Sequence, residues 1–145
     1  MEHAHVFYPL IKRASKEIPK IISETYYEAL KVEKISPIAF SILIRRTLEL
    51  LCKDQNAGGN NLKLQLKNLA DKNIIPNTLF EMGDTLRNLG NLGAHSSEYN
   101  FDYVEIEAMK DFIIAMLEFV YVAPAKIEEL RKSIEKKKTT VPNTI

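Results

Sequence analysis

The apolar residues of this 145-residue chain recur at intervals of three and four positions, in runs that begin at helix-capping residues. This spacing places apolar side chains on one face of an α-helix, and no stretch shows the alternation typical of a half-buried strand. In the segment after Pro19, for example, Ile22, Tyr26 and Ala29 share such a face. The pattern therefore predicts an all-α protein.

Capping residues indicate where the helices begin. Ser36 followed by Pro37 is typical of an N-cap with proline at the first helical position, and Asn61 is a cap of the same kind. Asp102 with Glu105 has the spacing of a capping box. The first expected helix follows Pro19, which we also assign to the first helical position. The expected helices span residues 19–34, 37–53, 62–72, 77–89, 102–123 and 124–138.

Glycine and proline indicate where two of these helices end. Gly90 is expected to end the fourth helix, because glycine readily adopts the left-handed conformation found at helix ends. The stretch TLRNLGNLGAH, residues 85–95, would then be a helix C-terminus and the loop after it. Pro124 is expected to separate the fifth helix from a mostly charged sixth helix. Short connections favour antiparallel neighbours, so we expect an up-and-down bundle of five or six helices with the apolar helix 37–53 at its centre.

The composition excludes several classes of protein. A chain with 46% hydrophobic and 27% charged residues is typical of one globular domain, here taken as residues 1–145, and a net charge of +1 gives no global signal for nucleic-acid binding. The N-terminus lacks the pattern of a secretory signal, and no run is long and apolar enough for a membrane span. Cys52, the only cysteine, lies in the apolar run LELLC, so we expect a buried thiol in a reducing cytoplasm. We expect no cofactor and no metal site, since AGGN is not a P-loop and no ligand cluster is evident.

Charged residues interrupt the most apolar helix. Arg45 and Glu49 are four positions apart and therefore share a face, which we expect to be substantially buried. Buried charges need partners, so one interpretation is an Arg–Glu pair that holds helices in register. The other is that Arg45 reaches into a polar site built partly from residues 85–95.

The stretch 85–95 itself carries three candidate site residues. Arg87 is explained by a helix C-terminus, where a cation is favoured, and Asn91 by a turn. His95 follows two glycines at a place where neighbours can fix its side chain. A histidine near neutral pKa can act as a general base, and an arginine can neutralise phosphate charge. The alternative is a structural histidine.

Taken together, these segments resemble a known bacterial family, the domain of unknown function 4145. The resemblance covers roughly residues 19–125, with the charged helix and tail 124–145 beyond it. Its most specific parts are an Arg-x-x-Leu-Glu run and an Arg-x-x-Gly-Asn-x-x-Ala-His run. They are matched by Arg45, Leu48 and Glu49, and by Arg87, Gly90, Asn91, Ala94 and His95.

That family is similar to the HEPN superfamily of small helical bundles, which are often dimeric and belong to prokaryotic defence and toxin–antitoxin systems. The resemblance implies a homodimer and metal-independent RNA cleavage, in which His95 performs acid–base catalysis and Arg87 stabilises charge on the phosphorus. Asn91 would orient a partner or close the loop, in a supporting polar cluster with Arg45 and Glu49. Arg46, Lys63 and Lys67 would add positive charge to an RNA-binding groove. Seven residues separate Arg87 from His95, more than in the active HEPN ribonucleases.

Two other functions stay open. The family also resembles accessory domains of restriction enzymes and other defence proteins, which implies a non-catalytic module that binds a protein partner. Such a module predicts a buried, hydrogen-bonded His95 and an exposed apolar patch elsewhere. A small-ligand sensor is the third alternative.

Overall fold

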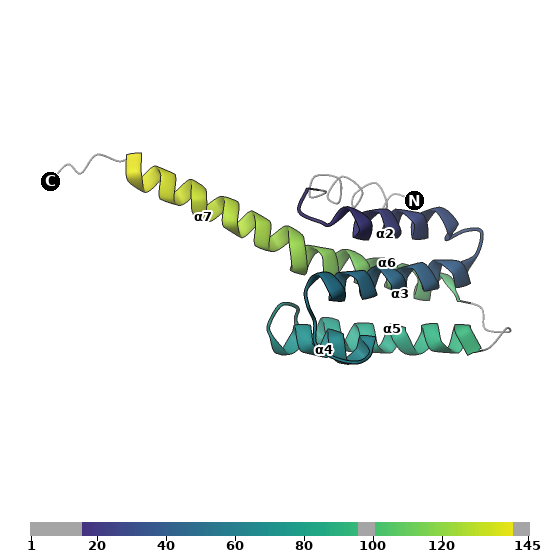
Figure 1. The fold of residues 1–145 in the computed structure, drawn as a ribbon. Coiled ribbons are helices and arrows are strands. Elements are labelled where there is room, and N and C mark those ends of the chain that lie inside the picture. Colours follow the sequence, from purple (N-terminus) through teal and green to yellow (C-terminus); the bar gives the residue numbers. More distant parts are fainter. Residues whose placement is uncertain (1–15, 96–100, 141–145) are drawn as a thin grey trace.

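The computed structural model describes residues 16–95 and 101–140, and for residues 89–95 it describes the backbone alone. These ranges form helices joined by turns, without a strand, which confirms the all-α bundle. Figure 1 shows three layers, with α2 in the first, α3 and α6 in the middle, and α4 and α5 in the third. The elements are α2 (Lys20–Val32), α3 (Pro37–Asp54), α4 (Leu62–Asp71), α5 (Asn77–His95), α6 (Tyr103–Leu117), the π-helical turn η1 (Glu118–Val122) and α7 (Ala123–Thr140).

The helix starts are fixed by the expected caps. The side chains of Ser36, Asn61 and Asp102 each accept a hydrogen bond from the backbone N–H three residues on, at 3.2, 2.9 and 2.8 Å. Each bond satisfies one of the N–H groups that a helix N-terminus leaves without a partner. Pro37 stands at the start of α3, as predicted. Pro19 is the N-cap of α2 and not its first helical residue, because its ψ of 135° is extended.

The hydrophobic core lies around α3, which packs against α2, α4, α5 and α6. This confirms the prediction that the most apolar helix is central. Its inward face carries Phe40, Leu51 and Cys52, all fully buried. Opposite them, α6 contributes Phe112 and Met116, and α2 and α4 close the two sides.

A close approach of α5 to α6 depends on Gly83. A Cβ built at this position would lie 2.7 Å from Cζ of the buried Phe112 ring and 3.3 Å from Cδ1 of Leu66. Real Cβ atoms do not make contacts as short as the first one. Glycine at position 83 therefore allows the two helices to pack at this distance.

The end of α5 differs from the prediction. The helix does not stop at Gly90 but continues through both glycines to His95. Glycine takes the right-handed helical conformation at a cost of about 1 kcal/mol relative to alanine, so it weakens a helix without ending it. The leucines at 86, 89 and 92 keep a helical spacing through the stretch. Residues 85–95 are thus helical throughout, and the expected loop is absent from them.

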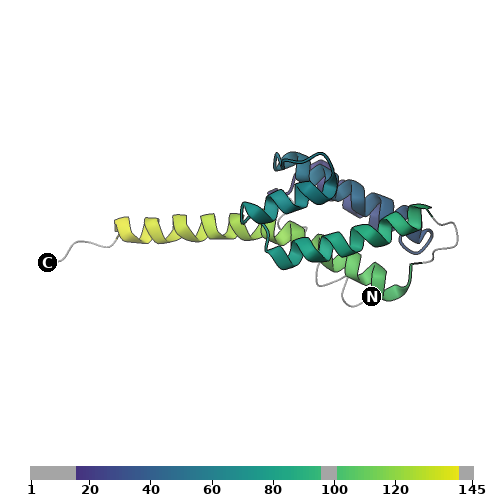
Figure 2. The same cartoon turned by 90° about the horizontal axis from the view of Figure 1, so that it is seen from below.

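The boundary at Pro124 also differs from the prediction, although the charged sixth helix exists. After α6 the backbone enters η1, where the N–H of Ala123 donates to the carbonyl of Glu118, and α7 follows without a break. Proline has no N–H and its ring would meet the carbonyl four residues earlier. The π turn lies just before Pro124, where the helix is wider than an α-helix, and the chain stays helical from Tyr103 to Thr140. Figures 1 and 2 show that α7 projects away from the bundle.

Replacing Gly83 by alanine tests the close packing of α5 on α6. We expect Gly83→Ala to lower the free energy of unfolding by about 1–2 kcal/mol, because overpacking against Phe112 outweighs the gain in helix propensity. Gly58→Ala is the matched control, since its Cβ would lie 3.6 Å from the Asn68 side chain, an ordinary contact. Denaturant unfolding followed by circular dichroism measures both. Equal stability of the two variants would contradict the packing account.

The thiol of Cys52 is expected to be inert in the folded protein. Burial, with a smaller effect of Glu49, raises its pKa to about 12, so at pH 8 almost no thiolate is present. Because Cys52 is the only cysteine, Ellman's reagent reports on it alone. We expect no reaction in native buffer and one equivalent in guanidinium chloride, with Cys52→Ser as the blank. Rapid modification of the native protein would show that the thiol is accessible.

Candidate functional site

A cavity of about 180 Å³ lies where α3, α4, α5 and α6 meet. Most of its wall is apolar, and two arginines complete it, Arg45 from α3 and Arg87 from α5. The structure therefore brings two of the sequence-predicted site residues to one cavity. The apolar wall includes Ile44, Leu48, Leu62, Leu86, Met109 and Phe112.

Arg45 pairs with Glu49, as one of the two interpretations predicted. Its Nε donates to Oε1 of Glu49 at 3.0 Å. The two side chains are 53% and 45% exposed, however, so the expectation that this face is substantially buried is wrong. Both residues belong to α3, and the pair therefore holds the Arg45 side chain in place without joining two helices. A solvated pair at this spacing stabilises the fold by about 0.3–0.5 kcal/mol.

Arg87 lies in the middle of α5 and not at a helix C-terminus. Its Nε and Nη2 donate to Oδ1 of Asp84 at 3.3 and 3.2 Å, and Nη2 also donates to Asn88. The other carboxylate oxygen of Asp84 lies 3.7 Å from Nζ of Lys63 on α4. A single carboxylate thus holds two of the predicted cations beside the cavity.

Asn91 and His95 follow Arg87 at successive four-residue intervals on the backbone of α5. Their side chains lie outside the described part of the molecule. A rise of 1.5 Å per residue separates the backbones of Arg87 and His95 by about 12 Å along the helix axis. The continuous helix therefore spaces this predicted catalytic pair two turns apart.

The other predicted binding residues do not gather around one groove. Arg46 faces a second groove, between α2 and α3, where Glu24, Glu28 and Lys31 also lie. Lys67 on α4 pairs with Asp71 at 3.6 Å and stands over the Phe80 ring. Of the three basic residues expected in an RNA groove, only Lys63 lies close to Arg87 through their shared carboxylate.

Two partly buried polar contacts could not be predicted from the sequence. Nζ of Lys110 on α6 lies 2.6 Å from Glu33 and 3.1 Å from Glu107. Burial lowers the pKa of Lys110, but hydrogen bonds to these carboxylates outweigh it and the pKa is raised. The lysine is therefore charged and ties α6 to the end of α2. A lone lysine in an apolar helix was the only available signal.

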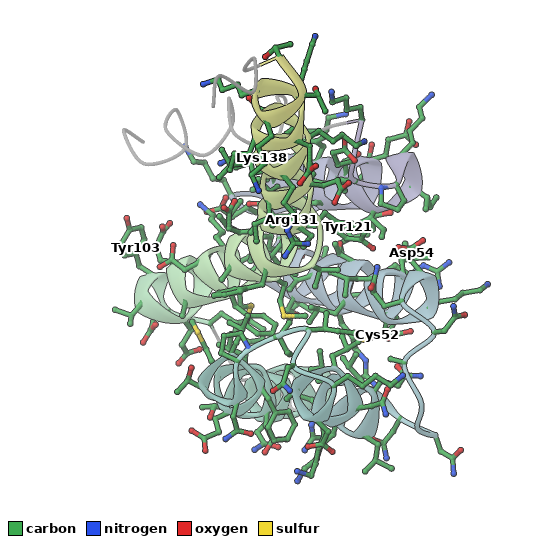
Figure 3. All side chains as sticks on the ribbon, turned by 90° about the vertical axis from the view of Figure 1, so that its left-hand side faces the viewer. Cys52, Asp54, Tyr103, Tyr121, Arg131 and Lys138 are labelled. Atoms are coloured by element: carbon green, nitrogen blue, oxygen red, sulfur yellow. The ribbon has the colours of Figure 1, made fainter. Side chains whose placement is uncertain are left out.

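The second contact anchors the start of α7. The hydroxyl of Tyr121 in η1 donates to Oδ2 of Asp54 at the end of α3, at 2.6 Å (Figure 3). Burial and this hydrogen bond raise the pKa of Tyr121, so the phenol keeps its proton. The contact fixes the end of the bundle from which α7 extends.

The exposed surface of α7 is a further feature that sequence analysis did not assign. None of its side chains is buried, yet three large apolar ones lie on it, and Figure 3 shows Arg131 and Lys138 on the same helix. Their spacing of three and four residues was visible in the sequence, but a covering partner within the chain was equally consistent with it. The three residues, here called the α7 stripe, are Ile127, Leu130 and Ile134.

Within residues 16–95 and 101–140, no three His, Cys, Asp or Glu side chains gather where a metal ion would bind. The helices of those ranges also include none with the length and apolar character needed to cross a membrane.

Comparison with known proteins returns a family match and nothing more specific. The family described as domain of unknown function (DUF4145) matches residues 27–137, which include α3 to α6 and most of α7. No curated protein and no solved structure matches the chain.

Proposed function

The chain belongs to the DUF4145 family, and we propose that it is a non-catalytic interaction module of a defence or restriction-type system, which binds a partner protein through α7. The observation that carries this proposal is the α7 stripe. Its residues Ile127, Leu130 and Ile134 are 50%, 61% and 45% exposed. A row of large aliphatic side chains on a projecting helix is typical of a surface that another helix covers.

The spacing of the α7 stripe favours a helix as the partner. Intervals of three and four residues correspond to the a and d positions of a heptad, with Ile127 and Ile134 at a and Leu130 at d. Such a narrow seam is the geometry of two-helix packing. A surface helix that enters a lipid interface generally has a wider apolar face with aromatic residues, and α7 has none.

The charges beside the α7 stripe indicate what the partner carries. Lys126, Arg131 and Lys138 occupy the g and e positions that border the seam. At 100° per residue, the three glutamates of α7 lie roughly 105–135° from the centre of the stripe, toward the opposite side of the helix. Among the described residues, no ion pair includes a residue of α7.

An acidic amphipathic helix is therefore the partner that fits. Glutamates at the e and g positions of such a partner would pair with the basic residues that border the seam. The same basic residues of a second α7 would instead repel them. Self-association through α7 is disfavoured for this reason. The homodimer implied by the HEPN resemblance stays a prediction and would need another surface.

The ribonuclease hypothesis has less support. It needs an arginine and a histidine acting together, and α5 spaces Arg87 and His95 by about 12 Å of helix rise. RNA is a polyanion and needs a groove with several cations, but Arg46 and Lys67 lie away from Arg87, and carboxylates offset part of the charge of Arg87 and Lys63. This hypothesis stays a prediction that depends on His95.

A designed peptide tests the proposed docking surface. The probe is a three-heptad helix with Leu and Ile at a and d and Glu at e and g, and its pair has Lys at e and g. We expect the full-length protein to bind the acidic peptide about tenfold more tightly than the basic one, measured by fluorescence anisotropy. Leu130→Ser should weaken binding by about tenfold, because burial of one leucine is lost.

Charge variants supply the matched control. Arg131→Glu with Lys138→Glu should weaken the acidic peptide by about tenfold and favour the basic one. Lys132→Glu with Lys136→Glu makes the same change of net charge on the far side of α7 and should change affinity less than about twofold. If both double variants lose the same affinity for the acidic peptide, net charge and not the position of the basic residues explains the binding, which would contradict the proposed seam. Binding of neither peptide, or preferential binding of anionic vesicles, would refute the proposal.

RNA cleavage tests the competing hypothesis. We expect a mixed RNA pool to stay intact when incubated with the wild-type protein in EDTA, because the cations near Arg87 are held by carboxylates. Cleavage by the wild type that His95→Ala abolishes, with the variant folded by circular dichroism, would establish the metal-independent ribonuclease instead.

A further inference from the structure

We propose that the cavity between α3, α4, α5 and α6 binds a small organic carboxylate with a hydrocarbon body. The body would enter the apolar interior, and the carboxylate would lie at the wall formed by Arg45 and Arg87. This proposal is independent of α7, because no residue of α7 lines the cavity.

The interior of the cavity is built from buried aliphatic and aromatic side chains. Ile44, Leu48, Leu62, Met109 and Phe112 are each at most 6% exposed. The space of about 180 Å³ has this buried inner wall but opens to solvent on the side lined by Arg45 and the exposed Ile42. An engineered apolar cavity of about 150 Å³ accommodates benzene. A single ring or a chain of about eight carbons is therefore the appropriate size.

The close packing at Gly83 keeps the cavity from collapsing in one direction. Gly83 lines the cavity and lies against the Phe112 ring, where a Cβ has no room. The ring is buried and held by its neighbours, so it serves as a fixed wall. The cavity beside the ring therefore results from the way the helices pack.

The polar side of the cavity matches a monoanion. Arg45, Arg87 and Lys63 lie around Glu49 and Asp84, and the formal charges of these five side chains sum to +1. The two carboxylates hold the guanidinium groups in fixed orientations. Nη1 of Arg87 makes no hydrogen bond to any described residue, so it has donors to offer. A ligand carboxylate would accept from this group while its body displaces solvent from the apolar wall.

Three ligands of equal chain length separate the contributions of the hydrocarbon chain and of the head-group charge to the affinity. Isothermal titration calorimetry of the full-length protein with octanoate, octan-1-ol and octylamine compares a carboxylate, a neutral group and a cation on one chain. We expect octanoate to bind about tenfold more tightly than octan-1-ol and octylamine to bind least. Acetate, which lacks the body, should show no binding.

Arginine variants test which side chain binds the carboxylate of octanoate. Arg87→Gln should reduce octanoate affinity about tenfold and leave octan-1-ol unchanged. Arg45→Gln, at a more exposed position, gives the same test if the first variant does not fold. Arg46→Gln is the matched control, because it is adjacent on α3 but faces the groove with α2. It should retain wild-type affinity.

A variant that fills the cavity tests whether the hydrocarbon chain of the ligand binds there. Ser41 lies on the cavity wall and is only partly buried, so Ser41→Phe can occupy the opening without disturbing the core. It should abolish binding of both octanoate and octan-1-ol. The proposal is overturned if octanoate fails to bind, if octylamine binds equally well, or if Arg46→Gln weakens octanoate as much as Arg87→Gln. None of these outcomes bears on peptide binding by α7.

Discussion

The burial of α6 against α3 and α5 is the constraint on which the rest of the structure depends. Phe112 and Met116 are almost inaccessible to solvent, and Gly83 is the residue that lets α5 come close enough to cover them. Once α6 is fixed in this way, the hydrogen bond from Tyr121 to Asp54 fixes its far end as well. Because the π turn keeps the backbone helical past Pro124, the direction of α6 becomes the direction of α7. A buried helix thus positions an exposed one.

The bundle and α7 differ in whether their charged side chains form ion pairs. In the bundle, cations such as Arg87, Lys63 and Lys110 form ion pairs with carboxylates. On α7, four of the six basic residues lie beside the apolar stripe, namely Lys126, Arg131, Lys137 and Lys138. The three glutamates lie on the far side of the helix, together with Lys132 and Lys136. A helix that served only to end the domain would need neither the stripe nor this segregation. The contrast supports recognition by a partner of opposite charge.

Much of the fold could be predicted from the sequence, because its determinants are local. Caps at Ser36, Asn61 and Asp102 depend on the backbone N–H three residues on, and helical periodicity gives the buried face of α3 directly. The end of α5 could not be predicted, because glycine at 90 is compatible with a helix end and with a helix interior, and packing decides. The same holds for Pro124, whose effect depends on the π turn before it.

The candidate site was less predictable, because it depends on contacts between helices. The pairing of Arg45 with Glu49 followed from their spacing, but their exposure depends on where α3 faces solvent. That Arg87 shares a cavity with Arg45, and a carboxylate with Lys63, is a property of the assembled bundle. The α7 stripe was visible as a spacing, yet only the structure places it away from the core.

Amide hydrogen exchange of the full-length protein, read by mass spectrometry with and without the acidic helical peptide, tests the central claim most directly. In the free protein, residues 124–140 should exchange fast while α3 and α6 stay protected, because local opening is easiest where no side chain is buried. Adding the peptide should slow exchange in α7 and leave the bundle unchanged. Slow exchange of α7 in the free protein, or protection that appears only in the bundle, would contradict the claim that α7 is an open docking helix.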